Sequence, residues 1–128
     1  MIGIIMNTQN FAFFTDNIVK LTQENENFRK VIATGKNSQV VLMNVLPGQE
    51  IGEEIHTIDQ IIIFVEGTGN AIINDKKSSI SPNDLFFIPA GTKHNFINTG
   101  SSPLKLYTVY APAEFEAGFV EKTKKFNK

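Results

Sequence analysis

From about residue 28 onward, short apolar runs rich in β-branched and aromatic residues alternate with turn-forming segments. The separating segments, among them PGQ, EGTG, NDKK, SPND, PAG and NTGSSP, are rich in residues that adopt or impose turns. Turn signals that recur about every eight to twelve residues are typical of an all-β sandwich or barrel. The predicted strands cover residues 28–33, 39–46, 54–66, 70–74, 84–89, 93–98 and 104–111.

The two ends of the chain have weaker patterns. Ile18 and Leu21 lie three residues apart within residues 15–27, which predicts one helical turn in an otherwise irregular segment. Residues 121–128 are basic and polar, and we expect them to form a solvated terminus. The predicted organisation is an N-terminal extension over residues 1–27, a β-barrel over residues 28–113 and a C-terminal tail over residues 114–128.

The predicted strand over residues 54–66 is apolar on both faces. One face can line the interior of a barrel, and the other face must then be covered by a second sheet or by another subunit. This pattern favours a homodimer. The apolar residues are Ile55, Ile61, Ile63 and Val65 at odd positions, and Ile58, Ile62 and Phe64 at even positions.

Composition and charge exclude several classes of protein. Hydrophobic residues make up 41% of the 128 residues, which suits a single globular domain. The net charge of -1 gives no electrostatic reason to expect nucleic acid or an anionic membrane as a partner. The chain has no cysteine, which excludes disulfides and thiolate ligands. No apolar run approaches a membrane span, and residues 1–6 lack the basic flank of a signal peptide, so we expect a cytoplasmic protein.

Candidate chemistry is concentrated in residues 52–69, GEEIHTIDQIIIFVEGTG. Because side chains alternate along a strand, Glu54, His56 and Gln60 are expected on one face. They share that face with Ile58, Ile62 and Phe64, the set that we assign to the interior. Buried charges need partners, and a divalent cation would satisfy all three polar groups. The only other histidine, His94, follows a Pro-Ala-Gly turn and is the candidate for a further ligand.

These segments resemble the two motifs of the cupin family. The first motif is a glycine, two histidines, a glutamate and a second glycine, and its positions are occupied here by Gly48, Glu54, His56, Gln60 and Gly67. The second motif is a glycine, a proline, a glycine, a histidine and an asparagine, and its positions are occupied by Asn83, Pro89, Gly91, His94 and Asn98. Every spacing fits. Three positions depart from the motifs: Glu54 replaces a histidine, Gln60 replaces the glutamate, and Asn83 replaces a turn glycine.

The resemblance extends over most of residues 17–125. Over this range the chain resembles small single-domain cupins labelled mannose-6-phosphate-isomerase-like. It implies a double-stranded β-helix, or jelly-roll, barrel that commonly forms a homodimer. It also implies metal ligands at Glu54, His56, Gln60 and His94. It says little about the substrate, because cupins support many chemistries.

Two imidazoles and one carboxylate suit non-haem iron, and manganese, nickel or zinc would accept the same atoms. The predicted cofactor is therefore one divalent transition metal, Fe, Mn, Ni or Zn. Two alternatives stay open. His56 could be a core histidine that is hydrogen-bonded to Glu54, and Gln60 could support a ligand instead of binding the ion.

The expected barrel interior is aromatic, and a small-molecule pocket beside the metal could be lined by Phe64, Lys93, Phe96, Tyr107 and Tyr110. Arg29 is the only arginine, which argues against a sugar-phosphate isomerase because the usual bidentate phosphate clamp is scarce. The predicted function is a metal-dependent enzyme, oxygenase-like or isomerase-like, that acts on a small molecule. The alternative is a cupin that binds or senses a small ligand without chemistry, with or without a vestigial metal site.

Overall fold

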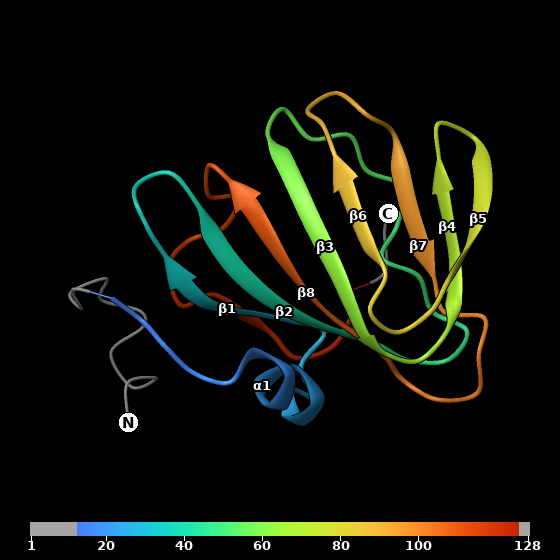
Figure 1. Ribbon diagram of the computed structural model, residues 1–128, viewed down its shortest axis with the longest axis horizontal. Coiled ribbons are helices and arrows are strands. Elements are labelled where there is room, and N and C mark those ends of the chain that lie inside the picture. Colours follow the sequence, from blue (N-terminus) through green and yellow to red (C-terminus); the bar gives the residue numbers. More distant parts are fainter. Residues whose placement is uncertain (1–12, 126–128) are drawn as a thin grey trace.

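Two antiparallel β-sheets form the body of the computed structural model, which describes residues 13–125 (Figure 1). The strands of the larger sheet follow the order β6 (Leu85–Ile88), β3 (Asp59–Glu66), β8 (Leu104–Ala111), β2 (Gln39–Val45), β1 (Arg29–Thr34) and β9 (Val120–Glu121). The strands of the smaller sheet follow the order β5 (Lys76–Ile80), β4 (Gly69–Ile73) and β7 (His94–Ile97). The all-β, jelly-roll prediction is confirmed.

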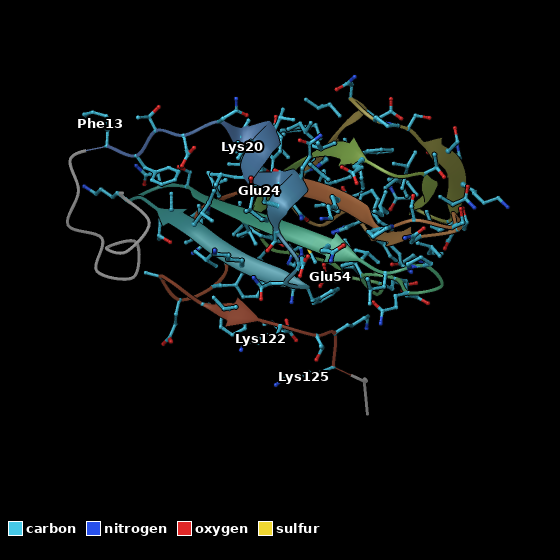
Figure 2. All side chains as sticks on the ribbon, turned by 90° about the horizontal axis from the view of Figure 1, so that it is seen from below. Phe13, Lys20, Glu24, Glu54, Lys122 and Lys125 are labelled. Carbon is cyan, nitrogen blue, oxygen red and sulfur yellow. The ribbon has the colours of Figure 1, made fainter. Side chains whose placement is uncertain are left out.

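A short helix, α1 (Ile18–Glu24), lies over one face of the larger sheet, where Lys20 and Glu24 mark it in Figure 2. The side chain of Asn17 caps it by accepting a hydrogen bond from the Lys20 amide at 2.9 Å. This confirms the helical turn predicted within residues 15–27. The first part of the predicted N-terminal extension, residues 1–12, lies outside the described residues, as do residues 126–128. Within residues 13–125, no helix has the length and apolar character needed to cross a bilayer.

Strand β5 lies between the predicted strands over residues 70–74 and 84–89, where the sequence predicts no strand. Four of its five residues are exposed and polar, so no hydrophobic alternation identifies it. It forms because it is the second arm of a hairpin with β4. The hairpin turn is made by Asn74 and Asp75, whose φ angles of 49° and 69° are those that tight two-residue hairpin turns require.

The strand predicted over residues 54–66 is shorter than expected, because β3 begins at Asp59. Residues 55–58 lie outside the strands, and Glu54 forms an isolated bridge with His94. The expectation that Glu54, His56 and Gln60 are aligned by one continuous strand is therefore wrong. Separate backbone contacts position them.

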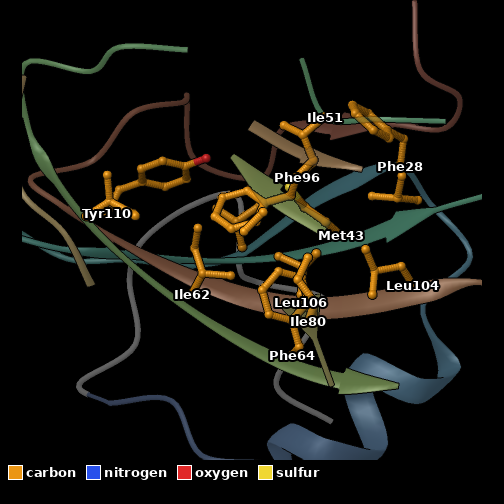
Figure 3. Close-up of a cluster of buried hydrophobic side chains, with 14 of the residues drawn as sticks. Phe28, Met43, Ile51, Ile62, Phe64, Ile80, Phe96, Leu104, Leu106 and Tyr110 are labelled. Carbon is orange, nitrogen blue, oxygen red and sulfur yellow. The ribbon is translucent and has the colours of Figure 1, made fainter. Parts of the chain in front are cut away.

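The hydrophobic core is built from both sheets. The rings of Phe64, Phe86 and Phe96 form its aromatic centre, with centroids 5.3 to 5.7 Å apart in tilted and edge-on contacts. Tyr110 lies at one side of this cluster and Leu104 lies at the other (Figure 3). The imidazole of His56 packs against the ring of Tyr110, so the polar site begins where this side of the core ends.

Two turn positions of the cupin-like motifs have a clear physical basis. Gly67 has a φ of 92°, and a Cβ added there would collide with the carbonyl oxygen of Pro103, so only glycine fits. Asn83, which stands at a glycine position of the second motif, has a φ of 75° and donates its amide hydrogen to the Phe64 carbonyl at 2.7 Å. Asparagine adopts this left-handed turn conformation in place of the glycine.

The outer face of the larger sheet is apolar near its β6 edge. Ile61 of β3 lies between Phe87 of β6 and Val109 of β8, so three apolar residues form one cross-strand row. A second row runs through Ile63. At the sheet edge, Phe87 is 55% exposed and Leu85 is 61% exposed. A continuous apolar surface therefore remains on this face within the described residues.

Candidate metal centre

Glu54 and His94 are held beside each other by their own backbones. The Glu54 amide donates to the His94 carbonyl at 2.9 Å, and the His94 amide donates to the Glu54 carbonyl at 3.0 Å. Residues opposed in an antiparallel bridge project their side chains to the same face. His94 is the first residue of β7, so the start of that strand places an imidazole next to the carboxylate.

His56 reaches the same place from a loop. Its carbonyl accepts a hydrogen bond at 2.8 Å from the amide of Gly91, which belongs to the Pro-Ala-Gly turn just before His94. Gly91 has a φ of 86°, a conformation that glycine adopts without strain. The same turn therefore leads into the strand of one histidine and anchors the loop of the other.

The three candidate ligands converge, as the sequence predicted. One ligand atom from each of Glu54, His56 and His94 lies within 4.8 Å of the others. The Oε1 atom of Glu54 is 3.1 Å from His56 Nε2 and 3.9 Å from His94 Nε2. The side chains of His94 and His56 are only 2% and 11% exposed. A carboxylate and two imidazoles thus share a small, largely buried volume.

The hydrogen bonding of His94 leaves its Nε2 atom available. Its Nδ1 atom lies 2.8 Å from the carbonyl oxygen of Thr92, and because a carbonyl only accepts, Nδ1 must carry a proton. In the neutral ring Nε2 then bears a lone pair, and this buried atom has no hydrogen-bond partner among residues 13–125. An unpartnered buried polar atom is costly, and a metal ion would satisfy it. The residues present therefore fit a metal.

Gln60 leaves a second buried atom without a partner. The hydroxyl of Thr108 donates to the Ile61 carbonyl at 2.9 Å, so its oxygen must accept from the Gln60 amide nitrogen at 3.0 Å. This arrangement fixes the amide orientation and leaves Gln60 Oε1 buried without a hydrogen-bond partner in the described part of the chain. Gln60 is thus anchored through its nitrogen, with its oxygen free to accept. Whether that oxygen binds an ion stays a prediction.

Comparison with known proteins identifies the family. Residues 41–110, more than half of the chain, match the family described as Cupin domain. The chain belongs to the cupin family.

This cupin is 40% identical over 118 residues to the uncharacterized protein YrkC of Bacillus subtilis, covering 87% of this chain and 63% of YrkC. The chain therefore spans less than two thirds of that relative's length. The crystal structure of BH2720 from Bacillus halodurans is 38% identical, with a TM-score of 0.84 over 85% of this chain and 88% of that one. A structure described as a predicted oxalate decarboxylase from Thermotoga maritima is 26% identical, with a TM-score of 0.57 over 61% of this chain and 69% of that one.

Three charged residues that the sequence did not predict surround the centre of this cupin. Arg29 Nη1 bonds to Glu121 Oε1 at 2.8 Å, and Arg29 Nη2 lies 4.0 Å from Glu54 Oε2. Glu114 Oε2 lies 3.4 Å from His56 Nδ1. The three glutamates and one arginine give this group a net charge of -2 when both imidazoles are neutral. A divalent cation would balance that charge.

The C-terminal segment is therefore more than a solvated tail. Glu121 belongs to β9, which runs beside β1 in Figure 2, and it pairs with the barrel residue Arg29. The guanidinium of Arg29 also lies over the ring of Phe115, 4.7 Å from its centroid. Two signals in the sequence could have revealed this packing. Arg29 is the only arginine, in an apolar strand, and Phe115 and Phe119 interrupt a polar tail.

Glu54 also affects the ionisation of the site. The hydrogen bond between Glu54 and His56 raises the pKa of His56, against the opposing effect of burial. Burial, with a smaller contribution from the Glu54 carboxylate, raises the pKa of Tyr110. Tyr110 therefore remains a neutral phenol beside the imidazole of His56, with ring centroids 5.6 Å apart.

The predicted pocket residues are only partly brought to the centre. Tyr110 contacts His56, and Phe96 lies 6.0 Å from the His94 ring between centroids, whereas Phe64 belongs to the core behind them. Lys93 pairs with Asp75 of the β4–β5 turn at 2.9 Å. Tyr107 alternates with the buried residues of β8 and so faces the outer surface of the sheet. The expectation that Tyr107 lines the site is therefore wrong.

Asn98, the last residue of the second motif, has a structural role. Its side-chain nitrogen donates to the carbonyls of Val45 and Ser102 at 2.8 and 2.9 Å, and its oxygen accepts from the Gly100 amide at 2.9 Å. These bonds hold together the end of β2 and the turn between β7 and β8.

A cavity of about 480 Å³ lies away from this chemistry. It is lined by residues of α1 and of the segments on either side of the helix, and by Lys30, Ile32 and Leu42 of the larger sheet. It contains none of the three converging ligands. The candidate functional site is therefore the cluster of Glu54, His56 and His94 and not this cavity.

Proposed function

We propose that this cupin binds one divalent transition metal ion through Glu54, His56 and His94 and uses it on a small molecule. The observation that supports this most strongly is the buried, unpartnered Nε2 atom of His94, beside a carboxylate and a second imidazole. Two-histidine, one-carboxylate sets suit non-haem iron, and manganese, nickel or zinc bind the same atoms. Gln60 would complete or support the set through its unpartnered oxygen.

A bound ion with open positions would supply Lewis acidity or activate water or dioxygen. The remaining roles belong to the chain. Thr92 holds the proton on His94 Nδ1, so the other nitrogen faces Glu54. Tyr110 covers one side of the His56 ring as a neutral phenol. These residues would orient the ligands and limit access of water, as expected of an oxygenase-like or isomerase-like enzyme.

The substrate we favour is a small molecule without a phosphate group. Arg29, the only arginine, is engaged by Glu121 and lies over two phenylalanine rings, so it is not available as a phosphate clamp. This argues against sugar-phosphate isomerisation, although the sequence resembles cupins with a mannose-6-phosphate-isomerase-like label. The likeness to the predicted oxalate decarboxylase of Thermotoga maritima supports a small substrate instead.

A second function is favoured by one contact. His56 Nε2 and Glu54 Oε1 are 3.1 Å apart, so this pair can satisfy itself through a hydrogen bond without an ion. In that case the protein would bind or sense a small ligand, and its metal site would be vestigial. This alternative leaves His94 Nε2 unsatisfied, which is why we prefer the metal-dependent function.

We also infer that two copies pair through the outer face of the larger sheet. The surface there is apolar and uncharged along the rows through Ile61 and Ile63. Such a surface is self-complementary, which suits the isologous contact of a twofold dimer. A cytoplasmic location stays a prediction from the sequence.

Elemental analysis of protein purified without added metal tests the proposed function. We expect one equivalent of a transition metal per chain in the wild type and loss of most of it in His94→Ala and Glu54→Ala. Lys93→Ala is the matched control, because Lys93 is adjacent to His94 but pairs with Asp75. Metal content that is unchanged in both ligand variants would contradict the proposal.

A further inference from the structure

The segment that follows β8 returns across the barrel and places an acid beside His56. We name residues 112–121 the C-terminal strap. It ends in β9, where Glu121 pairs with Arg29 through both the backbone and the side chain. Within the strap, the ring of Phe115 contacts that of Tyr110 edge-on, with centroids 5.6 Å apart, and stacks on that of Phe119 at 5.4 Å. The strap is therefore packed against the same residues that border the metal centre.

A single buried side chain clasps the strap at the position of Glu114. Gln39 Oε1 accepts hydrogen bonds from the amides of Glu114 and Phe115 at 3.1 and 3.0 Å. Gln39 Nε2 donates to the Phe115 carbonyl at 2.7 Å and to the Thr34 hydroxyl at 2.9 Å. All hydrogen-bonding capacity of this amide is used, so the backbone at Glu114 has a defined place relative to β2.

From that place, the Glu114 carboxylate faces the Nδ1 atom of His56, with Oε2 at 3.4 Å. The other ring nitrogen, Nε2, faces Glu54. His94 obtains the equivalent Nδ1 contact from the Thr92 carbonyl, a group of its own turn. His56 instead obtains it from a carboxylate that lies far along the chain. Among the described residues, both histidines therefore have an oxygen facing Nδ1, which is a hydrogen-bonded carbonyl at 2.8 Å for His94 and a carboxylate at the longer distance of 3.4 Å for His56.

The position of the ring proton decides whether His56 can bind an ion. A neutral imidazole carries one proton, and a metal needs the other nitrogen as a lone-pair donor. With the proton on Nε2, the ring donates to Glu54 Oε1 at 3.1 Å, and that nitrogen cannot bind an ion. An acceptor at Nδ1 favours the tautomer with its proton there, and it also fixes the ring orientation and increases the basicity of Nε2.

We infer that Glu114 is a positioning residue that holds the proton of His56 at Nδ1 and so directs Nε2 into the metal centre. This inference rests on the proposed metal-binding function. It gives the C-terminal strap a part in metal affinity, because the Gln39 bonds and the pairing of β9 with β1 place Glu114 beside His56. The two cupin motifs do not contain this residue.

Titration of the metal-free, full-length protein with Co²⁺ tests the inference, with the visible absorption of the bound ion giving both affinity and ligand environment. Glu114→Leu removes the acceptor while keeping similar bulk, and we expect affinity to fall about 10- to 100-fold with a changed Co²⁺ spectrum. Glu114→Gln keeps an acceptor oxygen, and we expect it to recover most of the affinity. Glu116→Ala, an exposed acid of the same strap, is the matched control and should bind as the wild type does.

The outcomes separate this inference from the proposed function. If the wild type binds Co²⁺ and Glu114→Leu binds it equally well, the positioning role is contradicted and the metal site stands. If Glu114→Gln is as impaired as Glu114→Leu, the hydrogen-bond argument is likewise contradicted. If the wild type itself binds no Co²⁺, the proposed function fails and this inference fails with it.

Discussion

Glu54 and His94 exchange both of their backbone hydrogen bonds, so one main-chain bridge places an acid and an imidazole on a common face. The bridge joins the loop before β3 to the first residue of β7 and thereby brings the two cupin motifs together. Because the bridge uses only backbone atoms, it survives replacement of either side chain. Substitutions at these two positions therefore test the chemistry of the site more than the fold.

Replacing His94 by alanine is expected to remove the stabilisation that a bound ion confers. A ligand present at 100 times its Kd stabilises the native state by about 2.7 kcal/mol. For a domain of this size that corresponds to a rise in Tm on the order of 10 °C. In scanning calorimetry, excess EDTA should lower the Tm of the metal-loaded wild type by roughly that amount and leave that of His94→Ala unchanged.

Lys93→Ala serves as the control for this experiment. The Lys93 side chain lies on the opposite face from that of His94 and pairs with Asp75. The Tm of Lys93→Ala should therefore respond to EDTA as the Tm of the wild type does. A wild-type Tm that EDTA does not alter would favour the vestigial site.

The metal-free protein should become less stable as the pH rises through the pKa of His56. The hydrogen bond to Glu54 raises that pKa above 6.5, so the native state binds the proton more tightly than the unfolded state does. The resulting stabilisation is fully present below the unfolded-state pKa of about 6.5 and is lost as the pH rises through the native pKa. Urea unfolding in EDTA, between about pH 5.5 and pH 9, measures this loss.

Glu54→Gln isolates the contribution of His56, because it removes the group that most raises its pKa. The wild type should have a higher free energy of unfolding than Glu54→Gln. This difference should be largest at low pH and should shrink as the pH rises. An excess that is constant across the range, or that grows, would show that the His56–Glu54 contact does not have this role.

The convergence of Glu54, His56 and His94 could be predicted from the sequence, because it depends on short-range spacing around the only two histidines. The prediction that one strand aligns Glu54 with Gln60 was wrong, because β3 begins at Asp59 and Glu54 instead forms an isolated bridge with His94. β5 has no apolar alternation and exists through its hairpin with β4, which periodicity does not detect. The contacts of Arg29 and Glu114 join distant parts of the chain, so the spacing within one segment does not reveal the partners of these residues.

Replacing Gly67 by alanine is expected to destabilise the protein by about 2–3 kcal/mol, as measured by urea unfolding. The new Cβ would sit in a left-handed backbone conformation and also collide with backbone atoms of Pro103 and Leu104. Gly48→Ala is a matched control, because Gly48 has a φ of 81° but no heavy atom within 4 Å of the added Cβ. It should cost only about 1 kcal/mol. Equal losses for the two variants would contradict the packing argument.

Charge on the outer face of the larger sheet is expected to disrupt the proposed dimer. Leu85→Glu and Phe87→Glu place carboxylates on exposed apolar positions of edge strand β6, where burial in an interface would be costly. Light scattering coupled to gel filtration should give the mass of a dimer for the wild type and of a monomer for these variants. Ile55→Glu, at a position 62% exposed but outside the sheets, should remain dimeric. A monomeric wild type would contradict the proposal.

The location of a bound ion tests the central claim most directly. A crystal of the zinc-loaded protein, measured at the zinc absorption edge, should show one anomalous peak per chain between Glu54, His56 and His94. Zinc should lie about 2.0–2.1 Å from Nε2 of both histidines and about 2.0–2.2 Å from a Glu54 oxygen. An anomalous peak elsewhere in the molecule, or none at all, would contradict it.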